Sequence, residues 1–70
     1  MADKVVYKDF TQPEIDFLLS LCNFSELERD VFLLRCKNVS IEEISYKLNI
    51  SVATVNRNIV RIKNKIRRVI

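Results

Sequence analysis

The stretch that decides the fold runs from Ser40 to Ile62 and reads SIEEISYKLNISVATVNRNIVRI. The hydroxyl of Ser40 can accept a hydrogen bond from the backbone at the start of a helix. Glu43, three residues later, can return one, which is the capping-box pattern. Apolar residues then recur at helical spacing as far as Leu48. The stretch therefore opens with a short helix, predicted over residues 41–48.

A three-residue turn, Asn49-Ile50-Ser51, follows this helix. Asn tolerates the left-handed conformation that ends helices, and Ser51 can cap the next helix. After the turn, apolar residues recur at steps of three and four, which predicts one helix from Val52 to about Val69. The seam residues are Val52, Val55, Ile59, Ile62, Ile66 and Val69.

Two helices joined this tightly, the second of them basic, indicate a helix-turn-helix unit over residues 40–62. The segment EEISYKLNISVATVNRNI resembles the helix-turn-helix of LuxR/GerE-type regulators and of region four of bacterial sigma factors. SELERDVFLLRCKNVS, just before it, resembles the preceding helix and loop of both families. Asn38 and Asn49 stand where these families usually have Gly, and Ser45 stands where they usually have Ala. Asn is the next-best left-handed residue and Ser is nearly as small as Ala, so the geometry should be retained.

Two further helices are predicted upstream, each behind a capping-box pattern. Thr11 precedes a helix over residues 12–22, and Ser25 precedes a helix over residues 26–37. Asn23, like the two asparagines named above, is predicted as a left-handed stop. The predicted fold is all-α: one domain over residues 1–70, with a tri-helical helix-turn-helix core. This core is winged-helix-like or homeodomain-like but has no wing. One N-terminal helix, a long basic C-terminal recognition helix and an N-terminal arm over residues 1–10 complete the domain.

The composition excludes several functions. Among 70 residues there is no His and no CxxC pair, so neither a metal site nor a cofactor is expected. No pairing of a nucleophile with a general base is evident either, so we do not expect an enzyme. The two cysteines are expected to be reduced and buried. No apolar run approaches membrane-spanning length and no signal peptide is evident, so we expect a cytoplasmic protein with no membrane contact and no small-molecule ligand.

The charge is strongly asymmetric along the chain. Residues 44–70 contain seven basic residues and no acidic one, whereas all nine acidic residues lie in residues 1–43. An acid-free basic segment is typical of a protein that binds a polyanion. A solvated basic surface helix is the alternative. With the resemblance, this pattern favours double-stranded DNA as the partner.

The last helix should turn its apolar line, Val55, Ile59, Ile62 and Ile66, toward the core and its other side toward DNA. Side chains near the start of a recognition helix reach base edges. The candidates for base contacts are Ala53, Asn56, Arg57, Val60 and Arg61. The candidates for phosphate contacts are Lys47, Ser51, Thr54, Lys63, Lys65, Arg67 and Arg68. The alternative at each position is a surface residue without a role.

The distal seam formed by Ile66, Val69 and Ile70 extends beyond a compact tri-helical core. Either the first helix covers it, or two copies pair through it as a homodimer. The leading functional hypothesis is a sequence-specific DNA-binding transcriptional regulator. The second is a module that docks on the transcription machinery, such as RNA polymerase, as the resemblance to sigma region four allows. Its contact would be an acidic patch of Asp9, Glu14, Asp16, Glu26, Glu28 and Asp30.

Overall fold

The structure is a computed structural model that describes residues 10–69. This part of the chain forms α1 (Gln12–Leu21), α2 (Glu26–Cys36), α3 (Ile41–Leu48) and α4 (Val52–Val69), and it contains no strand. The all-α prediction is confirmed, and each helix ends within one residue of its expected bound. Most of the predicted N-terminal arm, residues 1–9, and Ile70 of the predicted seam lie outside the described residues.

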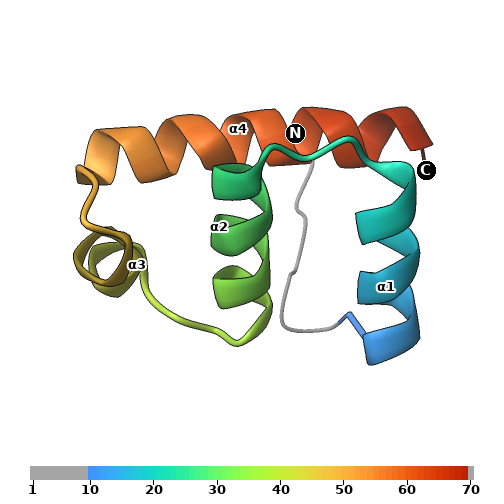
Figure 1. Cartoon of the computed structure of the whole chain (residues 1–70), viewed down its shortest axis with the longest axis horizontal. Helices are drawn as coiled ribbons and strands as arrows, with labels where there is room; N and C mark the ends of the chain where they lie inside the picture. Colours follow the sequence, from blue (N-terminus) through green and yellow to red (C-terminus); the bar gives the residue numbers. More distant parts are fainter. Residues whose placement is uncertain (1–9, 70) are drawn as a thin grey trace.

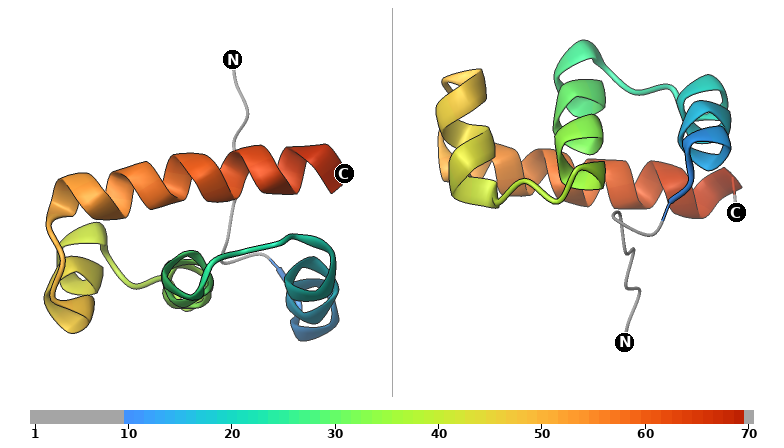
Figure 2. Two further views of the ribbon diagram at one scale, coloured as in Figure 1. Left: turned by 45° about the horizontal axis from the view of Figure 1, so that its top comes forward. Right: turned by 90° about the horizontal axis from the view of Figure 1, so that it is seen from below.

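The helices are arranged in two layers, with α4 alone in one of them (Figure 1). The other three helices lie across α4, and α3, α2 and α1 meet it in that order from its N-terminus to its C-terminus (Figure 2). One side of α4 is therefore covered along its length, whereas its opposite side faces solvent.

Side-chain caps define where the helices begin. Both predicted capping boxes upstream are complete, at Thr11 for α1 and at Ser25 for α2. The box predicted for α3 is only half formed. The Ser40 Oγ accepts from the Glu43 amide at 3.1 Å, but among the described residues no bond returns from the Glu43 carboxylate to the Ser40 amide. One bond at this position is enough to start α3, because it satisfies one of the unpaired first-turn amides.

Two of the three predicted left-handed stops are present. Asn38 has φ 64° and Asn49 has φ 57°. The third prediction, at Asn23, is wrong, because α1 ends instead at Cys22 in an extended conformation with φ −83° and ψ 131°. This extended exit carries the chain along α4, where the Asn23 carbonyl accepts a hydrogen bond from Lys65.

The core lies between the two layers and is formed by all four helices. Phe32 of α2 is fully buried at its centre, and the rings of Phe10 and Phe24 pack against it at centroid distances of 6.1 and 5.2 Å. Both cysteines are free thiols, as expected; Cys22 is buried, but Cys36 is only half-buried. The side chains with essentially no exposure are Val31, Phe32, Ile44, Val55, Ile62 and Ile66.

Candidate nucleic-acid interface

The face of α4 that packs on the core differs by one residue from the predicted apolar line. Val55, Asn58, Ile62 and Ile66 are buried, whereas Ile59 is only half-buried. At about 100° per residue these four side chains share a sector about 80° wide, and Ile59 lies at its edge. Ile59 packs against the core from this edge, as predicted. The polar Asn58, which the predicted line did not include, is buried beside it.

Asn58 and the start of α4 are linked by hydrogen bonds. The Asn58 Nδ2 donates to the Thr54 carbonyl at 2.8 Å, and the Ser51 Oγ accepts from the Thr54 amide at 3.0 Å. The Ser51 and Thr54 hydroxyl oxygens also lie 2.9 Å apart, within hydrogen-bonding distance. Because both hydroxyls help to hold the first turn, a phosphate at this end would rely more on backbone amides than on these hydroxyls.

The outer side of α4 presents the residues predicted to read base edges. All five of them are exposed: Ala53, Asn56, Arg57, Val60 and Arg61. No side chain of the described core covers Arg57 or Arg61. This arrangement meets the geometric requirement for insertion of the helix into a major groove, because the reading side chains share one open face.

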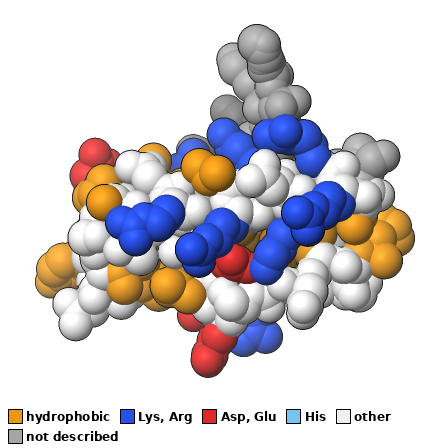
Figure 3. Space-filling model, turned by 90° about the horizontal axis from the view of Figure 1, so that it is seen from above, with side chains coloured by type: hydrophobic (Ala, Val, Ile, Leu, Met, Phe, Trp, Pro, Cys, Tyr) orange, Lys and Arg blue, Asp and Glu red, His pale blue; other side chains and the backbone are white. Residues whose placement is uncertain are grey.

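Basic side chains follow one another along this outer side (Figure 3). Among the predicted phosphate contacts, Lys47 and Ser51 are exposed near the start of α4, and Arg67 and Arg68 are exposed at its end. Thr54 and Lys63 are half-buried. The positions flank the base-reading residues along the helix, as contacts to the two backbones of a groove would require.

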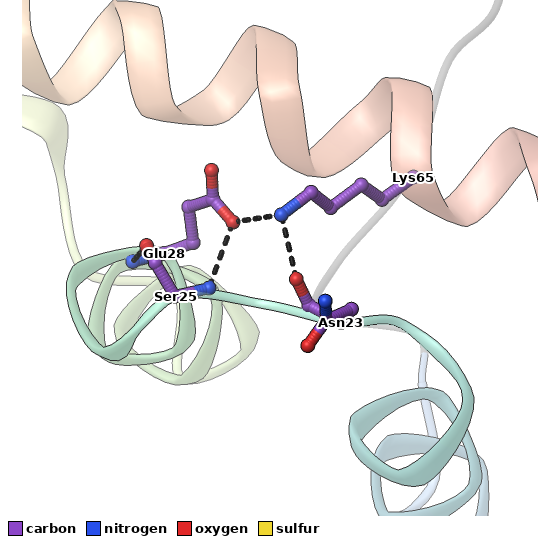
Figure 4. Close-up of polar contacts among 4 residues, drawn as sticks. All are labelled: Asn23, Ser25, Glu28 and Lys65. Atoms are coloured by element: carbon purple, nitrogen blue, oxygen red, sulfur yellow. Dashed lines mark hydrogen bonds and ion pairs between the residues drawn. The ribbon is translucent and has the colours of Figure 1, made fainter.

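Lys65 is a correction to the predicted phosphate contacts. Its Nζ donates to the Glu28 Oε1 and to the Asn23 carbonyl oxygen, both at 2.6 Å, so it points toward α2 and the α1–α2 connection (Figure 4). An ammonium held by two oxygens of its own chain has little capacity left for a phosphate. At about 100° per residue, Lys65 lies about 20° from Asn58, at the edge of the buried sector of α4, so its side chain can turn toward α2.

Glu28, which receives this bond, is 3% exposed. Burial by itself raises the pKa of its carboxyl, but hydrogen bonds from the Lys65 ammonium and the Ser25 amide bring that pKa below its usual value. Glu28 is therefore removed from the acidic patch that was considered for protein docking. The capping-box spacing from Ser25 is the one sequence signal for the role of Glu28, and nothing in the sequence indicates its partner on α4.

The predicted dimer seam is also corrected at Ile66. This side chain is 1% exposed and belongs to the same core cluster as Ile15 and Leu18 of α1 and as Cys22, which caps α1. Of the two alternatives, the structure supports coverage by the first helix, since α1 buries Ile66 within a single chain. Val69 remains exposed, and Ile70 lies outside the described residues.

The described residues lack two other kinds of feature. No helix among residues 10–69 is long and apolar enough to cross a membrane. The same residues contain no group of three or more His, Cys, Asp or Glu side chains placed to hold a metal ion.

Comparison with known protein families adds independent information. The family model described as sigma-70, region 4, matches residues 17–66. The matched region begins within α1, includes all of α2 and α3, and ends at Ile66 of α4. Comparison with curated proteins found no match, and neither did comparison with solved structures.

Proposed function

Because the chain belongs to the sigma-70 region 4 family, whose helix-turn-helix domains have a DNA-binding, transcription-related role, we propose that it is a sequence-specific regulator of transcription. It would bind double-stranded DNA with α4 in the major groove. It would act by binding alone, without catalysis and without a cofactor.

One observation carries this proposal: the outer side of α4 is exposed, basic and free of acidic residues. A phosphate backbone attracts such a surface, and the attraction supplies most of the sequence-independent affinity. The covered side of α4 is held by three other helices, so the helix is presented to DNA as a rigid rod. A major groove admits one helix of this kind.

Sequence discrimination would come from the first half of α4. The Arg57 guanidinium can donate two hydrogen bonds to one guanine, and the Asn56 amide can pair with an adenine. Val60 is apolar yet 57% exposed on the same face, which suits contact with a thymine methyl group. Exposed basic side chains at both ends of the face, such as Lys47 and Arg68, would contact phosphates.

The test compares Arg57→Ala with Arg68→Ala on a DNA duplex selected for tight binding and on a scrambled duplex. Arg57→Ala should lower affinity for the selected duplex by about 10-fold or more, with a much smaller loss on the scrambled one. Arg68→Ala should weaken binding to both duplexes by a similar factor. Equal behaviour of the two variants would reject the division between base and phosphate contacts, and no DNA binding by the unmodified chain would reject the function.

The second candidate function, docking on RNA polymerase, rests on the family and on the acidic side chains that remain exposed. Glu14, Asp16 and Glu26 are exposed on α1 and at the start of α2, on the layer opposite the basic face. Such a chain could contact polymerase with one layer and DNA with the other. Polymerase pull-down with and without nuclease separates the functions, because retention that survives nuclease requires a direct protein contact.

A further inference from the structure

We propose that two copies of this chain associate through the end of the molecule formed by α1 and the last turn of α4. Phe17 and Leu21 of α1 are 58% and 47% exposed, and Val69 of α4 is 36% exposed. Hydrophobic side chains gather at this end in the space-filling view (Figure 3, right). This surface differs from the predicted seam, because Ile66 is covered by α1 and takes no part in it.

The end surface is hollowed rather than flat. A hollow of about 230 Å³ lies where the C-terminal ends of α1 and α4 meet, and another of about 190 Å³ lies beside the first half of α1. The first is lined by Leu21, Cys22, Asn23, Lys65, Arg68 and Val69. The second is lined by Phe10, Glu14, Phe17 and Leu18. Each hollow can receive an apolar side chain, and Phe17 or Leu21 of another copy has the size to fill it.

The charges along this surface favour a second copy as its occupant. α1 contains acidic residues, Glu14 and Asp16, and no basic one, whereas the last turn of α4 is basic. α1 begins far from α4 and ends beside it (Figure 1), so the surface runs from acidic, through apolar, to basic. A twofold axis through the apolar part would place Glu14 of each copy near Arg68 of the other.

This order suits an isologous interface, because a twofold axis would pair the acidic end of each surface with the basic end of the identical surface on the other copy. A partner of one charge sign would match only one end of the strip and would meet like charge at the other. We therefore assign the surface to the chain itself rather than to an acidic or a basic partner.

The expected association is weak. A stable interface usually buries about 800 Å² per partner, and the whole molecule exposes 4795 Å². Three partly exposed apolar side chains at one end supply only part of that area. We expect a dissociation constant on the order of 100 μM, in the range of transient contacts.

Weak pairing would still matter on DNA, and this consequence rests on the proposed function. Two copies bound to adjacent sites of one duplex experience a high effective concentration of each other, so the second copy binds more tightly than the first. Leu21 and Phe17 lie on α1 and not on the base-reading face of α4. A substitution at Leu21 or Phe17 should therefore remove self-association without removing a contact to a single DNA site.

The experiment is sedimentation equilibrium of the full chain without DNA, from about 20 μM to 1 mM, chosen to bracket the expected constant. The unmodified chain should shift from monomer to dimer, and Leu21→Arg should remain monomeric. Tyr46→Arg is the matched control: Tyr46 is 87% exposed on α3, which crosses the opposite end of α4. This variant should dimerise as the unmodified chain does.

Three outcomes would overturn the proposal. These are a monomer at every concentration, a Leu21→Arg dimer, or equal loss of dimer in both variants. Binding of each variant to a single-site duplex is measured in parallel, by fluorescence anisotropy at concentrations at which the chain is monomeric. If the unmodified chain binds the single-site duplex but never dimerises, only this proposal is rejected. If it dimerises but does not bind the duplex, only the proposed function is rejected.

Discussion

The Lys65 ammonium and the Glu28 carboxylate join α4 to α2 across 37 residues of sequence, with Nζ 2.6 Å from Oε1. The two ends of this ion pair differ in exposure, since the Lys65 side chain is 30% exposed and that of Glu28 only 4%. The almost fully buried carboxylate is tolerated because hydrogen bonds from the ammonium and from the Ser25 amide offset the cost of removing its charge from water. Removing the lysine would leave that charge buried.

Replacing Lys65 with Met should therefore destabilise the domain although it removes no apolar contact. We expect a loss of about 1–3 kcal/mol, the usual range for a hydrogen bond to a charged group that is left without its partner. In a domain of this size each kcal/mol lowers the melting temperature by roughly 4–8 °C. Thermal and urea unfolding followed by circular dichroism measure the effect. Lys63→Met, two residues away on the same helix, is the control and should change stability by less than about 0.5 kcal/mol.

Acid should weaken the same contact in a defined direction. The pKa of Glu28 lies below its ordinary value of 4.5: burial acts to raise it, but the bonds from Lys65 and Ser25 outweigh burial. The unfolded chain therefore takes up this proton at a higher pH than the folded chain. The contribution of Glu28 to stability is complete above about pH 4.5 and is lost as pH falls through its lower folded-state pKa.

Urea midpoints measured between pH 7 and pH 3 test this expectation. Glu28→Gln should be less stable than the unmodified chain at pH 7, and its stability should fall less steeply below pH 4.5. Parallel acid profiles for the two proteins would show that Glu28 does not titrate in this way.

The helices could be predicted from sequence because their boundaries depend on local chemistry. Thr11, Ser25, Ser40 and Ser51 each place a hydroxyl oxygen where a first-turn amide needs an acceptor. The exposed half of the candidate site could also be predicted, since helical spacing alone places Arg57 opposite the apolar seam. Helix starts and exposed helix faces could therefore be predicted from the sequence, because they depend on residues only a few positions away.

The errors at Lys65 and Asn23 concern contacts between segments distant in sequence, whereas Asn58 was missed although its hydrogen-bond partner is only four residues away. Lys65 appeared to belong with the other basic residues of the tail, because nothing near it in sequence reveals Glu28. An apolar pattern identifies Ile59 correctly, but it excludes the polar Asn58, whose side-chain amide is satisfied by the Thr54 carbonyl. Asn23 has the same sequence context as the two left-handed asparagines, but the path along α4 requires an extended chain there.

Asn23, Asn38 and Asn49 each stand two residues before a Ser that caps the next helix, and substitutions at Asn23 and Asn49 test this last point. Asn49→Ala should cost about 1 kcal/mol, because a Cβ without a polar group is unfavourable at positive φ. Asn49→Gly should be close to neutral, since glycine adopts that conformation without strain. Asn23→Ala should also be close to neutral, because Asn23 contributes its backbone carbonyl and not a left-handed conformation. Equal losses at the two asparagines, measured by urea unfolding, would contradict the assignment.

The two thiols should react slowly in the folded protein. Burial raises the pKa of Cys36 to about 11, and burial also raises the pKa of Cys22. At pH 8 the thiolate fraction of Cys36 would be lower than that of an unfolded cysteine by roughly 100-fold. Labelling with iodoacetamide, followed by mass spectrometry in native buffer and in urea, tests this. Rapid native modification at Cys36 would contradict the assigned environment.

The salt dependence of DNA binding should separate the basic residues that reach phosphates from the one that supports the fold. The slope of log affinity against log salt concentration is negative, and a substitution that removes one phosphate contact reduces its magnitude by about 0.9. Arg68→Gln should show this change, because the exposed Arg68 lies at the end of the basic face. Lys65→Gln should leave the slope unchanged despite its lower stability, since its ammonium faces Glu28. The measurement is made at a temperature at which circular dichroism shows both variants fully folded. A reduced slope for Lys65→Gln would mean that DNA draws Lys65 away from Glu28, and the ion pair would then be exchanged on binding rather than retained.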